Sequence, residues 1–173
     1  LSCEEQSWMT VEADMNRQHF EFEKSIRLNV TNETLDAHRV LVKWAVRKTD
    51  ATILREEEQW LEVPVLSAVW LDKVELPQID CFNEYVSYEA WENDQIISQG
   101  TVIFSYPKYF HYLNPGLAVR VDGDEIVVKA EAYAKSVEIR NENDDLILED
   151  NYFDINAGEY RVKILDGKPD GLK

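Results

Sequence analysis

The sequence predicts an all-β chain that folds as two β-sandwiches in tandem. Apolar residues recur with a period of two along most of the 173 residues, which is the spacing of side chains on one face of a strand. Turn-forming residues separate these short runs, and aromatic residues, which favour pleated surfaces, make up 11% of the chain. Helical periodicity is weak: residues 4–14 could form a helical turn, but Trp8-Met9-Thr10-Val11 fits an entering strand equally well.

The first half begins with two strongly alternating runs. Residues 26–31 and 40–47 each alternate between apolar and polar side chains, which predicts two strands with one buried and one solvated face. The turn-rich stretch 31–36 connects them, and Asn93-Asp94 predicts a hairpin turn further on. More strands are expected at Ile53–Trp60, Ser67–Leu76, Val86–Trp91 and Ile96–Phe104. Glu56-Glu57-Glu58 indicates a charged strand face or edge.

The second half repeats this pattern on a smaller scale. Residues 117–121 and 126–130 flank Asp122-Gly123-Asp124, a strong signal for a short hairpin. Three more strands are expected around Val137 and Ile139, around Leu146 and Leu148, and along Tyr160–Ile164, with turns at 141–145 and 156–158. Short strands at this spacing favour a sandwich.

The pattern is interrupted between the two halves. Residues 105–113 contain Pro107, and Asn114-Pro115-Gly116 follows directly. Each proline removes a backbone donor and restrains the residue before it, so neither stretch continues a strand. The predicted domains are therefore 1–106 and 107–173.

The charge of the chain excludes two classes of partner. Its net charge of −16 would repel nucleic acid and anionic membrane surfaces. No apolar run approaches the roughly 20 residues that span a bilayer. The two cysteines, Cys3 and Cys81, make no disulfide framework, so a reduced pair is favoured over a bridge, and a cytoplasmic location is slightly favoured. A start at Leu1, without an initiator Met or a signal pattern, indicates a piece of a longer chain.

The sequence predicts no catalytic, cofactor-binding or metal-binding residue. His19, His38 and His111 lie far apart without metal-ligand spacing, and solvated or capping roles are favoured. Neither a nucleophile elbow nor a glycine-rich phosphate loop is present. A Ser/His/Asp or Cys/His constellation assembled by the fold is left open. The glutamates of three Asn-Glu dipeptides are interpreted as solvated turn acids rather than a glycosidase pair, at Asn32-Glu33, Asn83-Glu84 and Asn141-Glu142.

Three further groups of residues have alternative interpretations. Asp122, Asp124 and residues 143–145 could hold calcium, but no twelve-residue loop pattern is present, so turns are favoured. Asn29-Val30-Thr31 and Asn32-Glu33-Thr34 match glycosylation acceptors, which matter only in a secreted protein. Four tryptophans could form a platform on which sugars stack, but positions in the core or at a domain interface are favoured for them: Trp44, Trp60, Trp70 and Trp91.

Two segments of the second half resemble a known family. Ala130-Glu131-Ala132-Tyr133-Ala134-Lys135-Ser136-Val137-Glu138-Ile139 and Asp150-Asn151-Tyr152-Phe153-Asp154-Ile155-Asn156-Ala157-Gly158-Glu159 together resemble the C-terminal Ig-like domain of β-mannosidases of glycoside hydrolase family 2. The resemblance reaches back to about Pro107. The first half resembles the Ig-like module that precedes that domain, with weaker markers at 29–47 and 63–71.

This resemblance implies the fold and the role of the chain. It implies two tandem Ig-like, or fibronectin-III-like, sandwiches, the second smaller and with its closing strand cut off after Lys173. In the family, the catalytic glutamates lie on a separate (β/α)-barrel, so no catalytic residue maps onto this chain. The expected function is a non-catalytic accessory segment that braces this barrel of the same parent chain, with oligosaccharide substrate at its margin. The parent would hydrolyse terminal β-D-mannosyl residues.

Other functions remain as alternatives. One is a carbohydrate-binding module that grips mannan through exposed Trp residues, and another is an adhesion sandwich of unrelated descent. Whether the parent acts on β-mannosides, β-glucosaminides or β-galactosides is left open.

The second family segment has its own structural interpretation. Residues 150–154 are expected to cross between the sheets, with Tyr152 and Phe153 buried and with the Asp and Asn side chains bonded to backbone groups in the turn. Gly158 is expected to supply a positive φ before the strand at Tyr160.

Overall fold

The computed structural model describes the backbone of residues 2–5, 9–14 and 17–173, and the side chains of residue 2 and of residues 22–173. Its only helix within those ranges is the 3₁₀ turn η1 (Pro107–Tyr109), so the predicted all-β class is confirmed. The chain divides into two compact units. Unit 1 consists of Leu1–Lys48 and Ile53–His111, and unit 2 of Thr49–Thr52 and Tyr112–Lys173. The domain limits of 1–106 and 107–173 stay a prediction.

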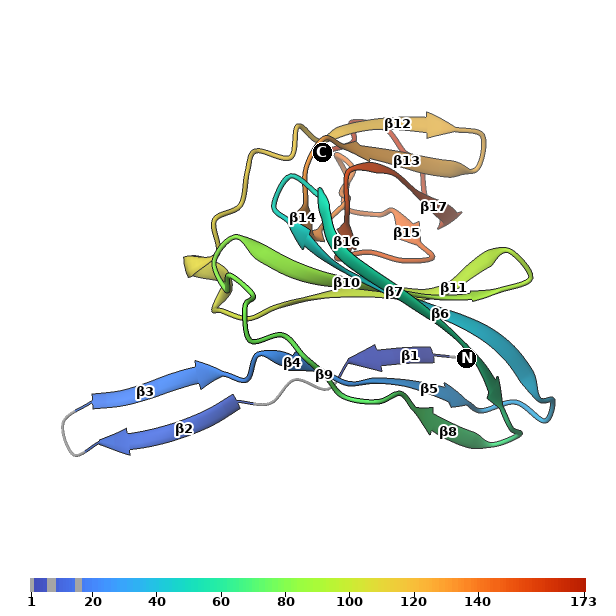
Figure 1. Cartoon of the computed structure of the whole chain (residues 1–173). Coiled ribbons are helices and arrows are strands. Elements are labelled where there is room, and N and C mark those ends of the chain that lie inside the picture. The colour runs from blue at the N-terminus through green and yellow to red at the C-terminus, as the bar shows by residue number, and fades with distance from the viewer. Residues whose placement is uncertain (1, 6–8, 15–16) are drawn as a thin grey trace. The chain divides into compact units, whose positions relative to one another are not determined.

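Unit 1 contains two main sheets (Figure 1). One has the order β1-β5-β8 and the other the order β11-β10-β6-β7. The strands of the first are β1 (Ser2–Glu5), β5 (Leu28–Asn32) and β8 (Ser67–Trp70). Those of the second are β6 (His38–Lys48), β7 (Ile53–Val63), β10 (Glu84–Glu92) and β11 (Gln95–Ile103). Two antiparallel pairs complete the unit: β2 (Met9–Asp14) with β3 (Arg17–Phe22), and β4 (Ser25–Ile26) with β9 (Val74–Glu75).

The core of unit 1 follows the period-two pattern of the sequence. The predicted apolar rows of β5 and β6 are buried and meet in one cluster, which contains Leu28, Val30, Val40, Val42, Trp44 and Val46. Strand β7 differs, because its residues 53–60 are exposed on both faces. It is one of the two edge strands of its sheet, and its three glutamates discourage pairing with another strand, as the sequence indicated. Strand β2 begins at Met9, whereas Trp8 lies outside the described residues.

Unit 2 is a smaller sandwich with its own core. One sheet has the order β12-β13-β17-β15, and the other pairs β14 with β16. Nine buried side chains form the core, among them Ile126, Val137 and Phe153. The strands are β12 (Ala118–Asp122), β13 (Glu125–Ala130), β14 (Ala134–Val137), β15 (Ile147–Leu148), β16 (Phe153–Ile155) and β17 (Gly158–Asp166).

Two predicted hairpins are confirmed by their backbone angles. Glu92 pairs with Gln95, and Asn93 and Asp94 between them have φ of 50° and 63°, the signs that a type I′ turn requires. In unit 2, Gly123 follows Asp122 with φ of 67°, the sign that the first central residue of a type II′ turn requires.

Side chains of the family segment connect β14 to β16. Lys135 Nζ lies 2.8 Å from Asp154 Oδ2, and the Ser136 N–H donates to Asp154 Oδ1 at 2.8 Å. Asn151 exchanges two hydrogen bonds with the backbone of Ile139, at 2.8 and 3.0 Å. The pairing of the two segments in the sequence is therefore explained by direct contact. The expected bonding within the turn is found at Asn151, whose Oδ1 accepts from the Tyr152 N–H at 3.0 Å, whereas Asp154 bonds to Ser136 in the other segment.

One expectation for this segment is wrong. Phe153 is buried, with 7% of its surface exposed, but Tyr152 is 62% exposed and its hydroxyl donates to Glu138. Tyr152 precedes β16, and its φ of 63° marks a turn that places its ring in solvent before Phe153 enters the core. Gly158 has φ of 132°, which confirms its expected positive angle.

The last described residue is bonded to the middle of unit 2. Arg140 and Lys173 exchange both of their backbone hydrogen bonds, at 3.2 and 2.9 Å, as two directly opposed strand residues do. The closing strand expected after this position stays a prediction.

Asp80 organises the turn that precedes β10. Its Oδ1 accepts from the Phe82 N–H at 3.0 Å and its Oδ2 from Asn83 Nδ2 at 2.8 Å. The Asn83 side chain and the Phe82 N–H together lower the pKa of Asp80. A lowered pKa in the folded state means that the ionised carboxylate stabilises the turn.

Replacing Asp80 by asparagine is expected to lower the stability of unit 1 at neutral pH but not in acid. The contribution of the carboxylate is present above the unfolded-state pKa of about 4 and disappears as the pH falls through the lower folded-state pKa. Urea unfolding of both proteins, followed by Trp fluorescence at several pH values, measures this difference. Asp72→Asn is the control, because the structure describes no hydrogen bond to this exposed side chain. A stability difference for Asp80→Asn that is unchanged in acid would contradict the assignment.

Candidate functional site

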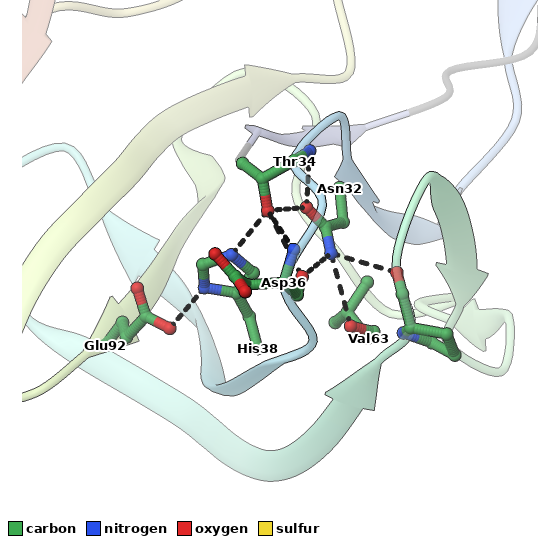
Figure 2. Close-up of polar contacts among 7 residues, drawn as sticks. Asn32, Thr34, Asp36, His38, Val63 and Glu92 are labelled. Carbon is green, nitrogen blue, oxygen red and sulfur yellow. Dashed lines mark hydrogen bonds and ion pairs between the residues drawn. The ribbon is translucent and has the colours of Figure 1, made fainter.

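A chain of hydrogen bonds joins a hydroxyl, an imidazole and a carboxylate at one end of unit 1 (Figure 2). Thr34 Oγ1 lies 2.7 Å from His38 Nε2, and His38 Nδ1 lies 2.7 Å from Glu92 Oε1. Thr34 belongs to the turn between β5 and β6, His38 begins β6, and Glu92 ends β10. The order of groups and the distances are those of a hydrolase triad.

The buried Asn32 holds this series of hydrogen bonds in place (Figure 2). Only 1% of its surface is exposed. Its Nδ2 donates to the carbonyl oxygens of Asp36 at 2.8 Å, Pro64 at 2.9 Å and Val63 at 3.4 Å. Its Oδ1 accepts from the backbone N–H and the hydroxyl of Thr34, at 2.9 and 2.8 Å. Asn32 therefore ties the β5–β6 turn to the end of β7.

The proton count of Thr34 favours a structural role for this triad-like chain. The hydroxyl has one proton but lies within bonding distance of three groups: Asn32 Oδ1, the Asp36 carbonyl at 3.2 Å and His38 Nε2. A nucleophile needs a hydroxyl whose proton is given to the imidazole, whereas here the turn itself competes for that proton. We interpret these hydrogen bonds as structural: they hold the β5–β6 turn against β10.

Sequence reasoning identified His38 as solvated or capping but missed the network. The Asn32-Glu33-Thr34 motif is also the pattern of a turn organised by an Asn side chain, but it was interpreted only as a match to a glycosylation acceptor. Since the Asn32 amide is buried and fully bonded, this motif does not present a glycosylation site in the fold.

The other histidines and the calcium candidates are not brought together. His111 contacts Asn83 Oδ1 at 3.0 Å and stacks on Phe82, and the side chain of His19 lies outside the described residues. Asp122 pairs with Arg161, whereas Asp145 bonds to Asn141. Among the side chains that the structure describes, no group of three or more His, Cys, Asp or Glu could hold a metal ion.

The four candidate tryptophans divide into two pairs. Trp44 is in the core and Trp91 is half-buried, whereas Trp60 and Trp70 are 54% and 44% exposed. Each ring has a cation above it: Arg55 for Trp44, Arg39 for Trp60, Arg27 for Trp70 and Lys43 for Trp91. The core alternative therefore holds for Trp44 but not for Trp60 and Trp70, and the interface alternative stays a prediction.

A groove of about 340 Å³ lies on the sheet formed by β6, β7 and β10. Its floor is made of small residues, Ala45 and Ser87, and Arg47 Nε donates to Ser87 Oγ at 2.8 Å. Lys43 lies on its wall, 3.5 Å from Glu58, and Glu89 faces it from β10. The groove is shallow, polar and rich in carboxylates.

No helix in the described part of the chain is long and apolar enough to cross a membrane. This observation concerns helices alone.

Comparison with known families identifies both units. Residues 24–109 match the family of mannosidase Ig/CBM-like domains, and residues 112–164 match the Ig-fold domain family of mannosidases. The chain is a tandem pair of mannosidase-type Ig-like domains. The resemblance and the two Ig-like sandwiches expected from the sequence are thereby confirmed. No curated protein matches these tandem Ig-like domains.

One solved structure shares the fold of the tandem Ig-like domains, and a second matches more weakly. A β-D-mannosidase from Dictyoglomus thermophilum matches with a TM-score of 0.70 and 17% identity, over 92% of this chain and 20% of that enzyme. A β-glucuronidase from Bacteroides uniformis matches with a TM-score of 0.38 and 14% identity, over 78% of this chain and 15% of that enzyme. The chain thus spans about a fifth or less of the length of each enzyme.

Proposed function

We propose that the tandem Ig-like domains are a non-catalytic accessory segment of a β-mannosidase of glycoside hydrolase family 2. The observation that carries this proposal is the arrangement of the two family matches, which follow one another in a single chain. The likeness of the chain to a fifth of a β-D-mannosidase structure supports it. The parent would remove terminal β-D-mannosyl residues with retention of configuration, using glutamates outside this segment.

The described residues fit a supporting role better than a catalytic one. A retaining glycosidase needs two carboxyl groups about 5 Å apart, one on either side of the scissile bond. The carboxylates of the groove on β6, β7 and β10, by contrast, lie on a sheet face next to Lys43 and Arg47, and Glu58 is paired with Lys43. Two sandwiches with separate cores suit a segment that braces a (β/α)-barrel of the same parent chain.

The purified chain is expected to show no hydrolysis of an aryl β-mannoside. Release of the aryl alcohol, followed by absorbance against a buffer blank, measures this activity. The Thr34→Val and His38→Gln variants test the triad-like hydrogen bonds. Any background hydrolysis of an ester or glycoside should be the same in the parent protein and in the two variants. Turnover that is lost in these variants would overturn the non-catalytic assignment.

The bracing role has a separate test in the parent enzyme. Deleting the segment that corresponds to these domains is expected to shorten the half-life of activity at elevated temperature, because the barrel loses a packed neighbour. The KM for an aryl β-mannoside should change little, since the reacting groups lie elsewhere. An unchanged half-life would contradict bracing.

A further inference from the structure

An apolar row crosses the sheet β11-β10-β6-β7 of unit 1 on its face away from the core. Leu41 on β6 is directly opposite Trp60 on β7 and Trp91 on β10, and Trp91 is directly opposite Ile96 on β11. Directly opposed residues of antiparallel strands share a face, so the four side chains form one continuous line, the aromatic row. Trp60 and Ile96 are 54% and 42% exposed, and the other two are half-buried.

The two rings of the aromatic row lie on strands that flank β6, so they are two strand spacings apart. Neighbouring strands lie about 4.8 Å apart, so Trp60 and Trp91 are separated by roughly 9.6 Å across the sheet. Two hexose rings of an extended β-1,4-linked chain cover a similar length. Each flat ring offers an apolar surface to the C–H face of a sugar and a polar edge to its hydroxyls.

The rings are held in place before any ligand binds. Trp91 Nε1 donates to Glu89 Oε2 at 2.8 Å, and the Arg39 guanidinium lies 4.4 Å from the centroid of Trp60. Fixing a ring in advance reduces the entropy that binding would cost. Arg39 covers part of Trp60, and Lys43 Nζ lies 5.4 Å from the centroid of Trp91, so both cations have to move aside for a sugar to stack; more than half of the Trp60 surface is already open to solvent.

Polar groups lie directly beside the aromatic row. The next line across the sheet consists of Glu58, Lys43 and Glu89, with Lys43 opposite both acids, and it forms one wall of the 340 Å³ groove. Carboxylates accept hydrogen bonds from sugar hydroxyls, and Lys43 donates them. Such an acidic wall, in a chain with a net charge of −16, disfavours anionic sugars and nucleic acids.

We propose that this face of unit 1 binds a neutral β-1,4-linked oligosaccharide, with hexose rings stacked on Trp60 and Trp91 and hydroxyls bonded to the adjacent polar line. The site does not depend on the catalytic activity of a parent enzyme. It would hold a glycan on the accessory domains instead of cleaving it.

The test is titration of the full 173-residue chain with β-1,4-mannohexaose and with cellohexaose, followed by calorimetry and Trp fluorescence. Saturable binding of at least one is expected in the millimolar range or tighter. Trp60→Ala should weaken it about tenfold or more, and Trp60→Tyr, which keeps a ring, should restore most of the affinity. Trp91→Ala should have a similar effect, with far-UV circular dichroism to establish that each variant is folded.

Trp70→Ala is the matched control for these variants. Trp70 is 44% exposed and has Arg27 above its ring, but it lies on β8 in the other sheet, so its loss should leave binding unchanged. No saturable binding of either hexasaccharide, equal losses from Trp70→Ala and Trp60→Ala, or binding of a hexalysine peptide instead would each overturn the proposal. Failure here would leave the hydrolysis assay of the proposed function unaffected, so the two can be judged separately.

Discussion

Replacing Phe153 by alanine is expected to lower the free energy of unfolding of unit 2 by about 3–5 kcal/mol. Phe153 is buried in the core of that unit, and its ring stacks on Tyr160 with 4.0 Å between the centroids. The substitution removes this stack and leaves a cavity between β14, β16 and β17, where a small core has few side chains that can move to fill it.

The neighbouring tyrosine provides the matched control for Phe153. Tyr152→Ala also removes a ring, but this side chain is 62% exposed, so a loss below about 1 kcal/mol is expected. All five tryptophans lie in the first 91 residues, so Trp fluorescence follows unit 1 and amide hydrogen exchange in residues 112–173 is needed to follow unit 2. Equal exchange rates in the two variants would show that Phe153 is not a core residue.

Asn32→Asp is expected to destabilise unit 1 by about 3–5 kcal/mol. The substitution replaces the Nδ2 donor by a second carboxylate oxygen, which faces the carbonyl oxygens of Asp36, Val63 and Pro64 in a site that is 1% exposed. An unpaired charge in such surroundings is costly, whereas Asn32→Ala removes only the hydrogen bonds, with an expected loss of about 2 kcal/mol.

Urea unfolding followed by Trp fluorescence measures both Asn32 variants. Thr34→Val serves as the comparison, because it removes the hydroxyl that links Asn32 to His38 but leaves the three carbonyl contacts of Asn32 in place. The expected order of stability is parent, Thr34→Val, Asn32→Ala and Asn32→Asp. If Asn32→Asp were as stable as Asn32→Ala, the assignment of the amide nitrogen toward the three carbonyls would be wrong.

The features predicted correctly from the sequence are those with a local cause. Alternation over 40–46 determines which side chains of β6 are buried, because neighbouring residues of a strand point to opposite faces. The hairpins at Asn93-Asp94 and Gly123 follow from residues that tolerate positive φ. The exposed Tyr152 was missed because the apolar character of a ring does not reveal the turn that places it in solvent.

The candidate sites depend on contacts between distant parts of the chain. Asn32 bonds to Val63 and Pro64, and His38 bonds to Glu92, 54 positions further along the chain. The aromatic row likewise exists only because β7 and β10 pair with opposite edges of β6 in one particular register. No local pattern carries such register information, so a single sequence shows the residues but not their alignment.

The pairing of β14 with β16 has a consequence for how unit 2 opens. These two strands contain four and three residues, and Lys135, Asn151 and Asp154 supply the bonds that a longer ladder would otherwise provide. Because three side chains hold the pair, their loss releases it as a single step, while the four-stranded sheet keeps its own ladder. We therefore expect β14 and β16 to separate before the ladder of β12, β13 and β17 opens, and proteases to cut first near these two short strands.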